Sequence, residues 1–143
     1  MDDRLREFLD EHHAAAMVTL GRNGTPHVAR VGVALVDGKL WSSGTQGRVR
    51  TGHLRRDSRS TLFVFDPRWR WVALESTATI LEGPDIPEMS LRLIRVMQGQ
   101  PPDSPGPAVW NGKEMTPDEF ARIMVEERRL IYQFEIHRHY GLF

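Results

Sequence analysis

Two short turn sequences constrain the fold of this chain more than any other feature. Asn23-Gly24 and Asp37-Gly38 each separate segments that are rich in apolar and β-branched residues. Both dipeptides tolerate positive φ and are strong signals for a tight β-hairpin. A parallel, doubly wound sheet is excluded here because its crossovers need a dozen or more residues. An antiparallel meander of three successive strands is therefore predicted at residues 14–20, 27–36 and 39–43.

The rest of the chain adds three strands and four helices to this prediction. Asp66-Pro67 separates two of the strands, because proline cannot continue a hydrogen-bonded ladder. Thr116 and Glu119 have the spacing of a capping box, with Pro117 at the first helical position, which predicts a helix start. The added strands are predicted at residues 60–66, 69–83 and 130–141, and the helices at residues 2–12, 87–99, 116–129 and a short stretch within 44–59.

These elements indicate an α+β fold. A chain of 143 residues is the size of one ordinary domain, and no repeat or linker divides residues 1–143. Antiparallel sheets of this size commonly protect their edges by closing into a barrel. We therefore predict one domain, built as a six-stranded antiparallel β-barrel with peripheral helices.

The composition excludes several classes of function. Lys and Arg together number 19, as do Asp and Glu, so the formal net charge is zero, and cysteine is absent. Disulfides, thiolate metal sites and thiol nucleophiles are thereby excluded. No stretch reaches the roughly 18–20 apolar residues of a membrane span, and the acidic N-terminus lacks an apolar signal region. We expect a cytoplasmic protein with no membrane association.

The segment 44–59, GTQGRVRTGHLRRDSR, concentrates the residues that point to a ligand. Arginine presents a planar fork of donors to phosphate oxygens, glycine lets backbone amides approach an anion, and threonine adds a hydroxyl donor. A phosphate cradle and a solvated basic helix face paired with Asp57 are equally compatible with this spacing. Nucleic-acid binding ranks below both because the whole chain carries no positive excess.

No catalytic motif accompanies this cluster. His137 and His139 are spaced to share one face of a strand, but no further ligand follows at a recognisable metal-site spacing. Ser42, Ser43 and Ser76 lack the G-x-S-x-G elbow of hydrolases, and neither a Walker motif nor a G-x-G-x-x-G fingerprint occurs. We therefore assign no catalytic side chain and no metal ligand.

The order of elements from Leu5 to Gly141 resembles the pyridoxamine 5′-phosphate oxidase-like split-barrel superfamily. The most specific part is RVRTGHLRRDSR, residues 48–59, which is similar to the motif R-x-R/K-x-x-x/N-L-R-R-D-x-R of its flavin/deazaflavin oxidoreductase B branch. Members of that branch bind coenzyme F420 and less often FMN. The resemblance implies the FMN-binding split-barrel fold, with the cofactor phosphate held between the third strand and the strand at 69–83.

The resemblance also implies roles for individual residues. Arg48 and Arg50 would grip the cofactor phosphate, although many relatives have Lys at position 50 and Asn at position 53. The same pocket would be lined by Thr51, His53 and Leu54. The ring system would be approached from the second strand by Arg30, Val31 and Gly32. In a homodimer, the partner chain would help to close each site. The candidate residues for this are Trp71 and the C-terminal stretch His139-Tyr140-Gly141. Packing in the core or between the two chains would explain Trp71 and Tyr140 equally well.

The chemistry implied is hydride transfer, in which the cofactor provides the reactive ring atom and the protein provides orientation. We expect an F420-dependent reductase that acts on an unsaturated small molecule, in a homodimer whose cofactor sites lie at the subunit interface. An FMN oxidase or reductase of the same fold is the first alternative. A non-catalytic carrier of flavin, haem or tetrapyrrole is the second.

Overall fold

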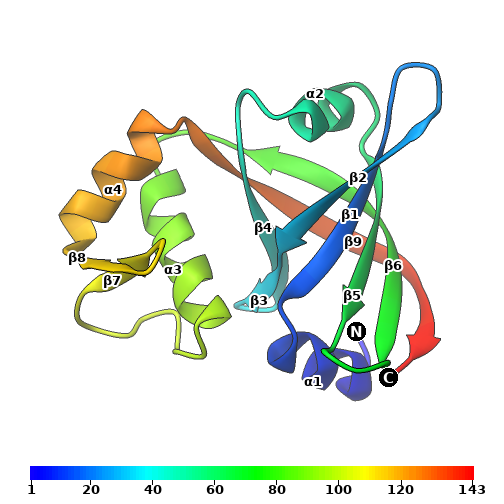
Figure 1. Ribbon diagram of the computed structural model, residues 1–143, viewed down its shortest axis with the longest axis horizontal. Coiled ribbons are helices and arrows are strands. Elements are labelled where there is room, and N and C mark those ends of the chain that lie inside the picture. The colour runs from blue at the N-terminus through cyan, green and yellow to red at the C-terminus, as the bar shows by residue number, and fades with distance from the viewer.

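The computed structural model describes residues 1–143 as nine strands and four helices (Figure 1). In chain order the elements are α1 (Asp3–Glu11), β1 (Ala14–Leu20), β2 (Pro26–Gly32), β3 (Ala34–Val36), β4 (Lys39–Thr45), α2 (Val49–Arg56), β5 (Arg59–Phe65), β6 (Trp71–Leu81), α3 (Ile86–Met97), β7 (Ala108–Trp110), β8 (Lys113–Met115), α4 (Pro117–Glu126) and β9 (Arg129–Leu142).

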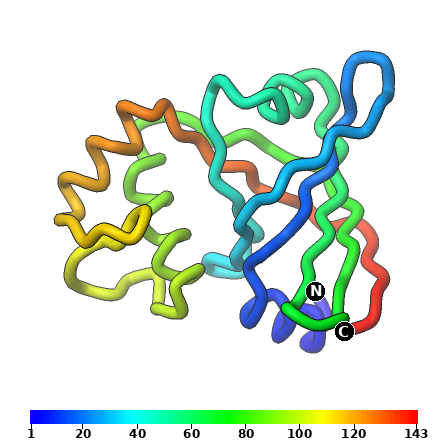
Figure 2. The backbone as a smooth tube through the Cα atoms, viewed as in Figure 1, coloured from blue at the N-terminus to red at the C-terminus, as the bar shows by residue number.

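Seven strands form one curled antiparallel sheet in the order β2-β1-β5-β6-β9-β4-β3, and β7 and β8 form a separate hairpin. The long central strands β6 and β9 pair over nearly their whole length, with one register shift between Glu75 and Ser76. Helix α2 crosses one end of the barrel and α1 the other, where both chain termini lie (Figures 1 and 2). The predicted α+β split barrel is confirmed, with more strands than the expected six.

The predicted meander is wrong because the expected strand at 27–36 bends at Val33. There the Val33 amide donates to the carbonyl oxygen of His13 (2.8 Å), which extends the β1–β2 register by one residue before the chain leaves that strand pair. As a result β2 pairs with β1, β3 pairs with β4, and the two strands end at opposite edges of the sheet. Ser42 Oγ on β4 donates to the carbonyl oxygen of Gly32 on β2 (2.7 Å), which links these distant parts of the sheet.

The β7–β8 hairpin was not predicted. Its strands have three residues each, too few for a visible alternation of polar and apolar residues. A signal was nevertheless present, because Asn111-Gly112 is an Asn-Gly turn, and both residues have positive φ (51° and 74°). The hairpin, α3 and α4 form a lobe beside the barrel (Figures 1 and 2). Its small core contains Ile94, Met115 and Phe120.

The helix starts follow from local chemistry. Asp2 caps α1 by accepting a hydrogen bond from the Leu5 amide (2.8 Å), and Thr116 caps α4 by accepting one from the Glu119 amide (3.1 Å). Both contacts satisfy amide groups that have no partner within a helix. The predicted helix start, with Thr116 as the N-cap, is therefore confirmed. No helix combines the length and the apolar character that crossing a membrane would require.

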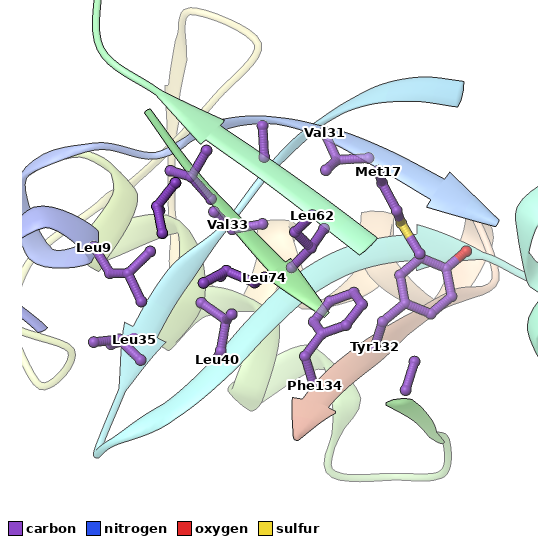
Figure 3. Close-up of a cluster of buried hydrophobic side chains, with 14 of the residues drawn as sticks. Leu9, Met17, Val31, Val33, Leu35, Leu40, Leu62, Leu74, Tyr132 and Phe134 are labelled. Carbon is purple, nitrogen blue, oxygen red and sulfur yellow. The ribbon is translucent and has the colours of Figure 1, made fainter. Parts of the chain in front are cut away.

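The main core fills the inside of the curled sheet (Figure 3). Alternate residues of each strand point inward, as the period of two requires. Leu54 joins this core from α2, and Leu5, Phe8 and Leu9 join it from α1. Tyr132 is fully buried at the end of the barrel next to α2, and its hydroxyl is the core's polar link to that helix.

Candidate functional site

Helix α2 begins where β4 leaves the sheet, and its first turn is open. Arg48 occupies the N-cap position, but no side chain caps the helix and no acidic residue lies in its first turn. The amides of Val49 and Arg50 have no acceptor in the protein. A helix N-terminus carries a partial positive charge, so this turn is suited to an anion.

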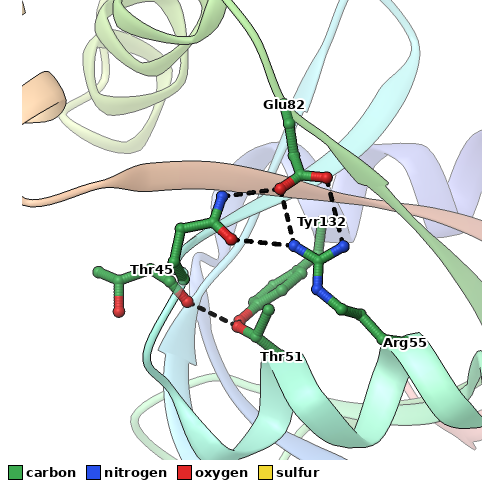
Figure 4. Close-up of polar contacts among 6 residues, drawn as sticks. Thr45, Thr51, Arg55, Glu82 and Tyr132 are labelled. Carbon is green, nitrogen blue, oxygen red and sulfur yellow. Dashed lines mark hydrogen bonds and ion pairs between the residues drawn. The ribbon is translucent and has the colours of Figure 1, made fainter.

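Thr51 fixes this open turn to the barrel (Figure 4). Its side chain is fully buried, and Thr51 Oγ1 donates to the carbonyl oxygen of Thr45 (2.7 Å). Since that bond uses the only hydroxyl proton of Thr51, Tyr132 must donate to Thr51 Oγ1, with 2.5 Å between the oxygens. Gly44 makes room for the Tyr132 ring, because a Cβ there would lie 2.3 Å from the tyrosine oxygen. The Thr51 side chain thus positions the start of the helix.

Three of the five arginines in this segment are engaged by the protein. Arg55 forms an ion pair with Glu82 (2.7 Å) and donates to Gln46 (3.0 Å), as Figure 4 shows. Arg56 donates to the carbonyl oxygen of Leu20. Arg59 forms a two-pronged contact with Asp57, and hydrogen bonding to this guanidinium lowers the pKa of Asp57 to about 2. These three side chains fit the interpretation of the segment as a basic helix face whose arginines are paired within the protein.

Arg48 and Arg50 are different, because neither guanidinium pairs with a carboxylate, and the polar side chain beside Arg50 is that of Tyr132. Arg50 is half-buried with its guanidinium over the Tyr132 ring, 5.9 Å from the centroid, and its Nε is buried without an acceptor. Burial is the main cause that lowers the pKa of Arg50, and the nearby charge of Arg48 adds to it. A buried, unpaired donor of this kind is costly unless a ligand satisfies it. The residues present therefore fit a phosphate group at the start of α2. The side chains of Arg48 and Arg50, with the amides of Val49 and Arg50, are called the cradle below.

His53 and Leu54 lie on the parts of α2 that face the barrel. His53 Nδ1 is 2.9 Å from Thr19 Oγ1, and its ring packs edge-to-face on His27 with centroids 5.2 Å apart. Leu54 is buried in the main core. Both residues are close to Arg48 and Arg50 in sequence, but their side chains contact the protein interior.

The three residues predicted on the second strand divide between its two faces. Val31 is buried in the main core, and Arg30 is exposed on the outer face. Gly32 packs against α3, where an added Cβ would lie 2.1 Å from the terminal carbon of Met97. A ligand outside the barrel would therefore contact Arg30 and not Val31.

Trp71 and Tyr140 lie on an aromatic outer face of the sheet. The Trp71 ring stacks on Phe63 (centroids 5.3 Å apart) and meets Tyr140 edge-on (6.2 Å). Phe63 and Tyr140 remain 38% and 44% exposed. The strand registers align a single row across this face: Arg30, Ala16, Phe63, Ala73 and Tyr140. Within one chain this face is remote from the cradle. Trp71 is the first residue of β6, whereas α2 lies near the other end of that strand. There the amide of Ala78 donates to the carbonyl oxygen of Ser58, which closely follows α2 in the chain.

Two residues near the cradle were missed by sequence reasoning. Tyr132 supports Thr51, and Arg129, the first residue of β9, pairs in register with Thr45. Nothing in the sequence indicates that β4 and β9 are neighbours, so neither contact was predictable. A cavity of about 620 Å³ is lined by the N-terminus and α1, the β3–β4 turn, Thr79 and β9, and neither Arg48 nor Arg50 lines it.

The fold defines a split-barrel protein, and the start of α2 is its candidate anion site. Residues 1–130 match the family model described as pyridoxamine 5′-phosphate oxidase. The chain belongs to this family, as the resemblance of its segment 48–59 implied.

Solved structures with the same fold span several kinds of protein. A conserved hypothetical protein of Mycobacterium tuberculosis is 20% identical, with a TM-score of 0.71, over 99% of this chain and 84% of that one. An F420 reductase is 17% identical, with a TM-score of 0.65, over 94% of each chain. A haem storage protein of Vibrio cholerae is 10% identical, with a TM-score of 0.67, over 99% of this chain and 94% of that one. At these identities the likeness shows the fold and does not decide the ligand.

Proposed function

We propose that this protein is an F420-dependent oxidoreductase that transfers hydride between the reduced deazaflavin and an unsaturated small molecule. The observation that supports the proposal most is that the five arginines of residues 48–59 fall into two groups. Arg55, Arg56 and Arg59 are bound by the protein, whereas Arg48 and Arg50 are left unpaired beside two free helix amides. A solvated basic face would give no reason for a half-buried arginine without a partner.

The residues of the chain act by binding and orientation. Arg48, Arg50 and the amides at the start of α2 would hold the cofactor phosphate, while Thr51 and Tyr132 keep that turn in place. Two guanidinium groups and a helix N-terminus suit a dianionic group better than a neutral one. When bound, a deazaflavin supplies the ring atom that carries the hydride. No side chain of the protein is required as a nucleophile.

We further propose a homodimer in which the aromatic outer face around Phe63 packs against a second copy. Phe63, Trp71 and Tyr140 surround the small residues Ala16 and Ala73, which leaves a shallow apolar surface exposed. Exposed apolar patches of this kind commonly mark an interface between proteins. The cavity of about 620 Å³ lies away from Arg48 and Arg50, and in this proposal the partner chain supplies the remaining walls of the cofactor site.

A titration with F420 and with FMN, followed by absorbance and fluorescence, tests the ligand. Arg48→Ala and Arg50→Ala should each weaken F420 binding about tenfold or more, because each loses charge-assisted hydrogen bonds to phosphate. Arg59→Ala is the matched control, since it removes the same charge but only breaks the exposed pair with Asp57. Equal affinities in the wild type and both site variants would contradict the proposal.

The same titration separates the alternatives. A protein that purifies colourless from a host without F420, binds added F420 and ignores FMN supports the F420 assignment. A protein that purifies yellow with FMN supports the FMN flavoprotein of this family. Tight F420 binding with no turnover against a panel of unsaturated acceptors would favour a carrier over an enzyme.

A further inference from the structure

Arg129 lies beside the proposed cradle on a different element. It opens β9 directly opposite Thr45, the last residue of β4 before the turn into α2. Its guanidinium lies over the ring of Trp110, 5.1 Å from the centroid, and its side chain is only 15% exposed. The residue before it, Arg128, has a φ of 54°, a left-handed conformation that is unfavourable for a non-glycine residue. Backbone strain of this kind often occurs where a side chain must be aimed.

The hydrogen bonds of Arg129 leave several of its donors available. Nε and one terminal nitrogen both contact the same oxygen of Glu127, at 2.8 and 2.7 Å. The other terminal nitrogen has only Ser43 Oγ, at the long distance of 3.5 Å. A guanidinium carries five N–H donors, so the pair with Glu127 does not satisfy it.

The local charge balance also calls for an anion. Arg48, Arg50 and Arg129 are near enough that the charges of the other two both act on Arg50. The one carboxylate in contact with any of these three groups is Glu127. Arg50 and Arg129 are partly buried and Arg48 is exposed, and like charges held near one another repel unless an opposite charge lies between them. The indole Nε1 of Trp110, beneath Arg129, is buried without an acceptor, as is Arg50 Nε; three further such atoms lie elsewhere, on His27, Ser90 and Arg95.

We infer that Arg129 is a third arginine of the anion site and that Trp110 forms the aromatic wall behind it. The segment 98–115, which connects α3 to α4 and contains the β7–β8 hairpin, would then take part in ligand binding through Trp110. The ligand would be a multiply charged anion, such as the phosphate-bearing part of the cofactor. This inference rests on the proposed function for the identity of that cofactor.

Two opposite substitutions test Arg129 with F420, FMN and inorganic pyrophosphate as probes, each by calorimetric titration. Arg129→Gln should weaken anion binding about tenfold, because it removes a charged donor. Glu127→Gln should strengthen binding several-fold, because it removes the competing negative charge and releases Arg129. A purely structural pair would give the opposite result for Glu127→Gln, with lower stability and no gain in affinity. Arg122→Gln, an exposed arginine on α4, is the charge-matched control.

Thermal unfolding of every variant separates misfolding from lost binding, and Arg129→Lys should restore part of the affinity because it keeps the charge. Unchanged affinity for all probes in Arg129→Gln, with losses in Arg48→Ala and Arg50→Ala, would overturn this inference and leave the proposed function intact. If neither flavin binds but pyrophosphate binds and responds to Arg129→Gln, the cofactor assignment fails and the anion site stands. A wild-type protein that binds no probe would overturn both.

Discussion

At the residue scale, the function of each arginine is decided by its partners and not by its type. Arg55 and Arg50 differ by five positions in the same basic segment, yet Arg55 is held by Glu82 and Gln46 while Arg50 is unpaired. The contrast separates the two arginines of the proposed anion site from the three arginines that the protein itself engages. It also gives each site variant a neighbouring variant of equal charge for comparison.

His53 is predicted to make stability depend on pH. Burial, followed by the charges of His27 and Arg56, lowers the pKa of His53 below its ordinary 6.5. The unfolded chain therefore binds more protons than the folded one near and below pH 6.5, so stability falls on acidification through that range. His53→Asn keeps a polar partner for Thr19 but cannot be protonated. Urea unfolding at several pH values between 5 and 7.5 should show a smaller loss of stability in this variant, and an unchanged slope would contradict the prediction.

At the element scale, α2 depends on the packing of β4 against β9. Thr51 bonds to the end of β4 and to Tyr132 of β9, so the start of the helix is held by two strands that are far apart in sequence. The predicted short helix is confirmed, but the contacts that anchor it come from tertiary structure. The cradle should therefore be sensitive to changes behind it as well as to changes within it.

Gly44→Ala is predicted to destabilise the protein and to weaken cofactor binding. The new Cβ would lie 2.3–2.6 Å from atoms of the fully buried Tyr132 side chain, which must move and pull on Thr51. Overpacking of this kind typically costs about 1–3 kcal/mol. Gly47→Ala is the matched control, because a Cβ there has nothing within 4 Å. Urea unfolding measures both, and equal stabilities for the two variants would refute this account.

At the scale of the whole molecule, the residues assigned to the cofactor form two separate groups. Arg48 and Arg50 lie at one end of the barrel, and Trp71 and Tyr140 lie on the aromatic outer face near the other end of β6. A single chain does not bring them together. If both groups contact one ligand, the second group must come from a partner.

Phe63→Glu is therefore predicted to convert the dimer to a monomer and to weaken cofactor binding together with it. The substitution places a charge in the middle of the apolar outer face, where desolvating it in an interface would be costly. Val125→Glu, on the exposed side of α4, is the control with the same chemical change. Sedimentation velocity gives the oligomeric state. A monomeric wild type that binds cofactor as tightly as expected would rule out the interface.

The sequence by itself determined the local features: the hairpin turns at Asn23-Gly24 and Asp37-Gly38, the capped helix at Thr116, and the basic segment before Arg59. These depend on φ preferences and contacts within a few residues, which neighbouring residue types specify. The tertiary structure alone decided that the strand at 27–36 divides, and which arginines are unpaired. Those outcomes depend on strand partners up to about a hundred positions away, and one chain's residue types do not encode such pairings in any local pattern.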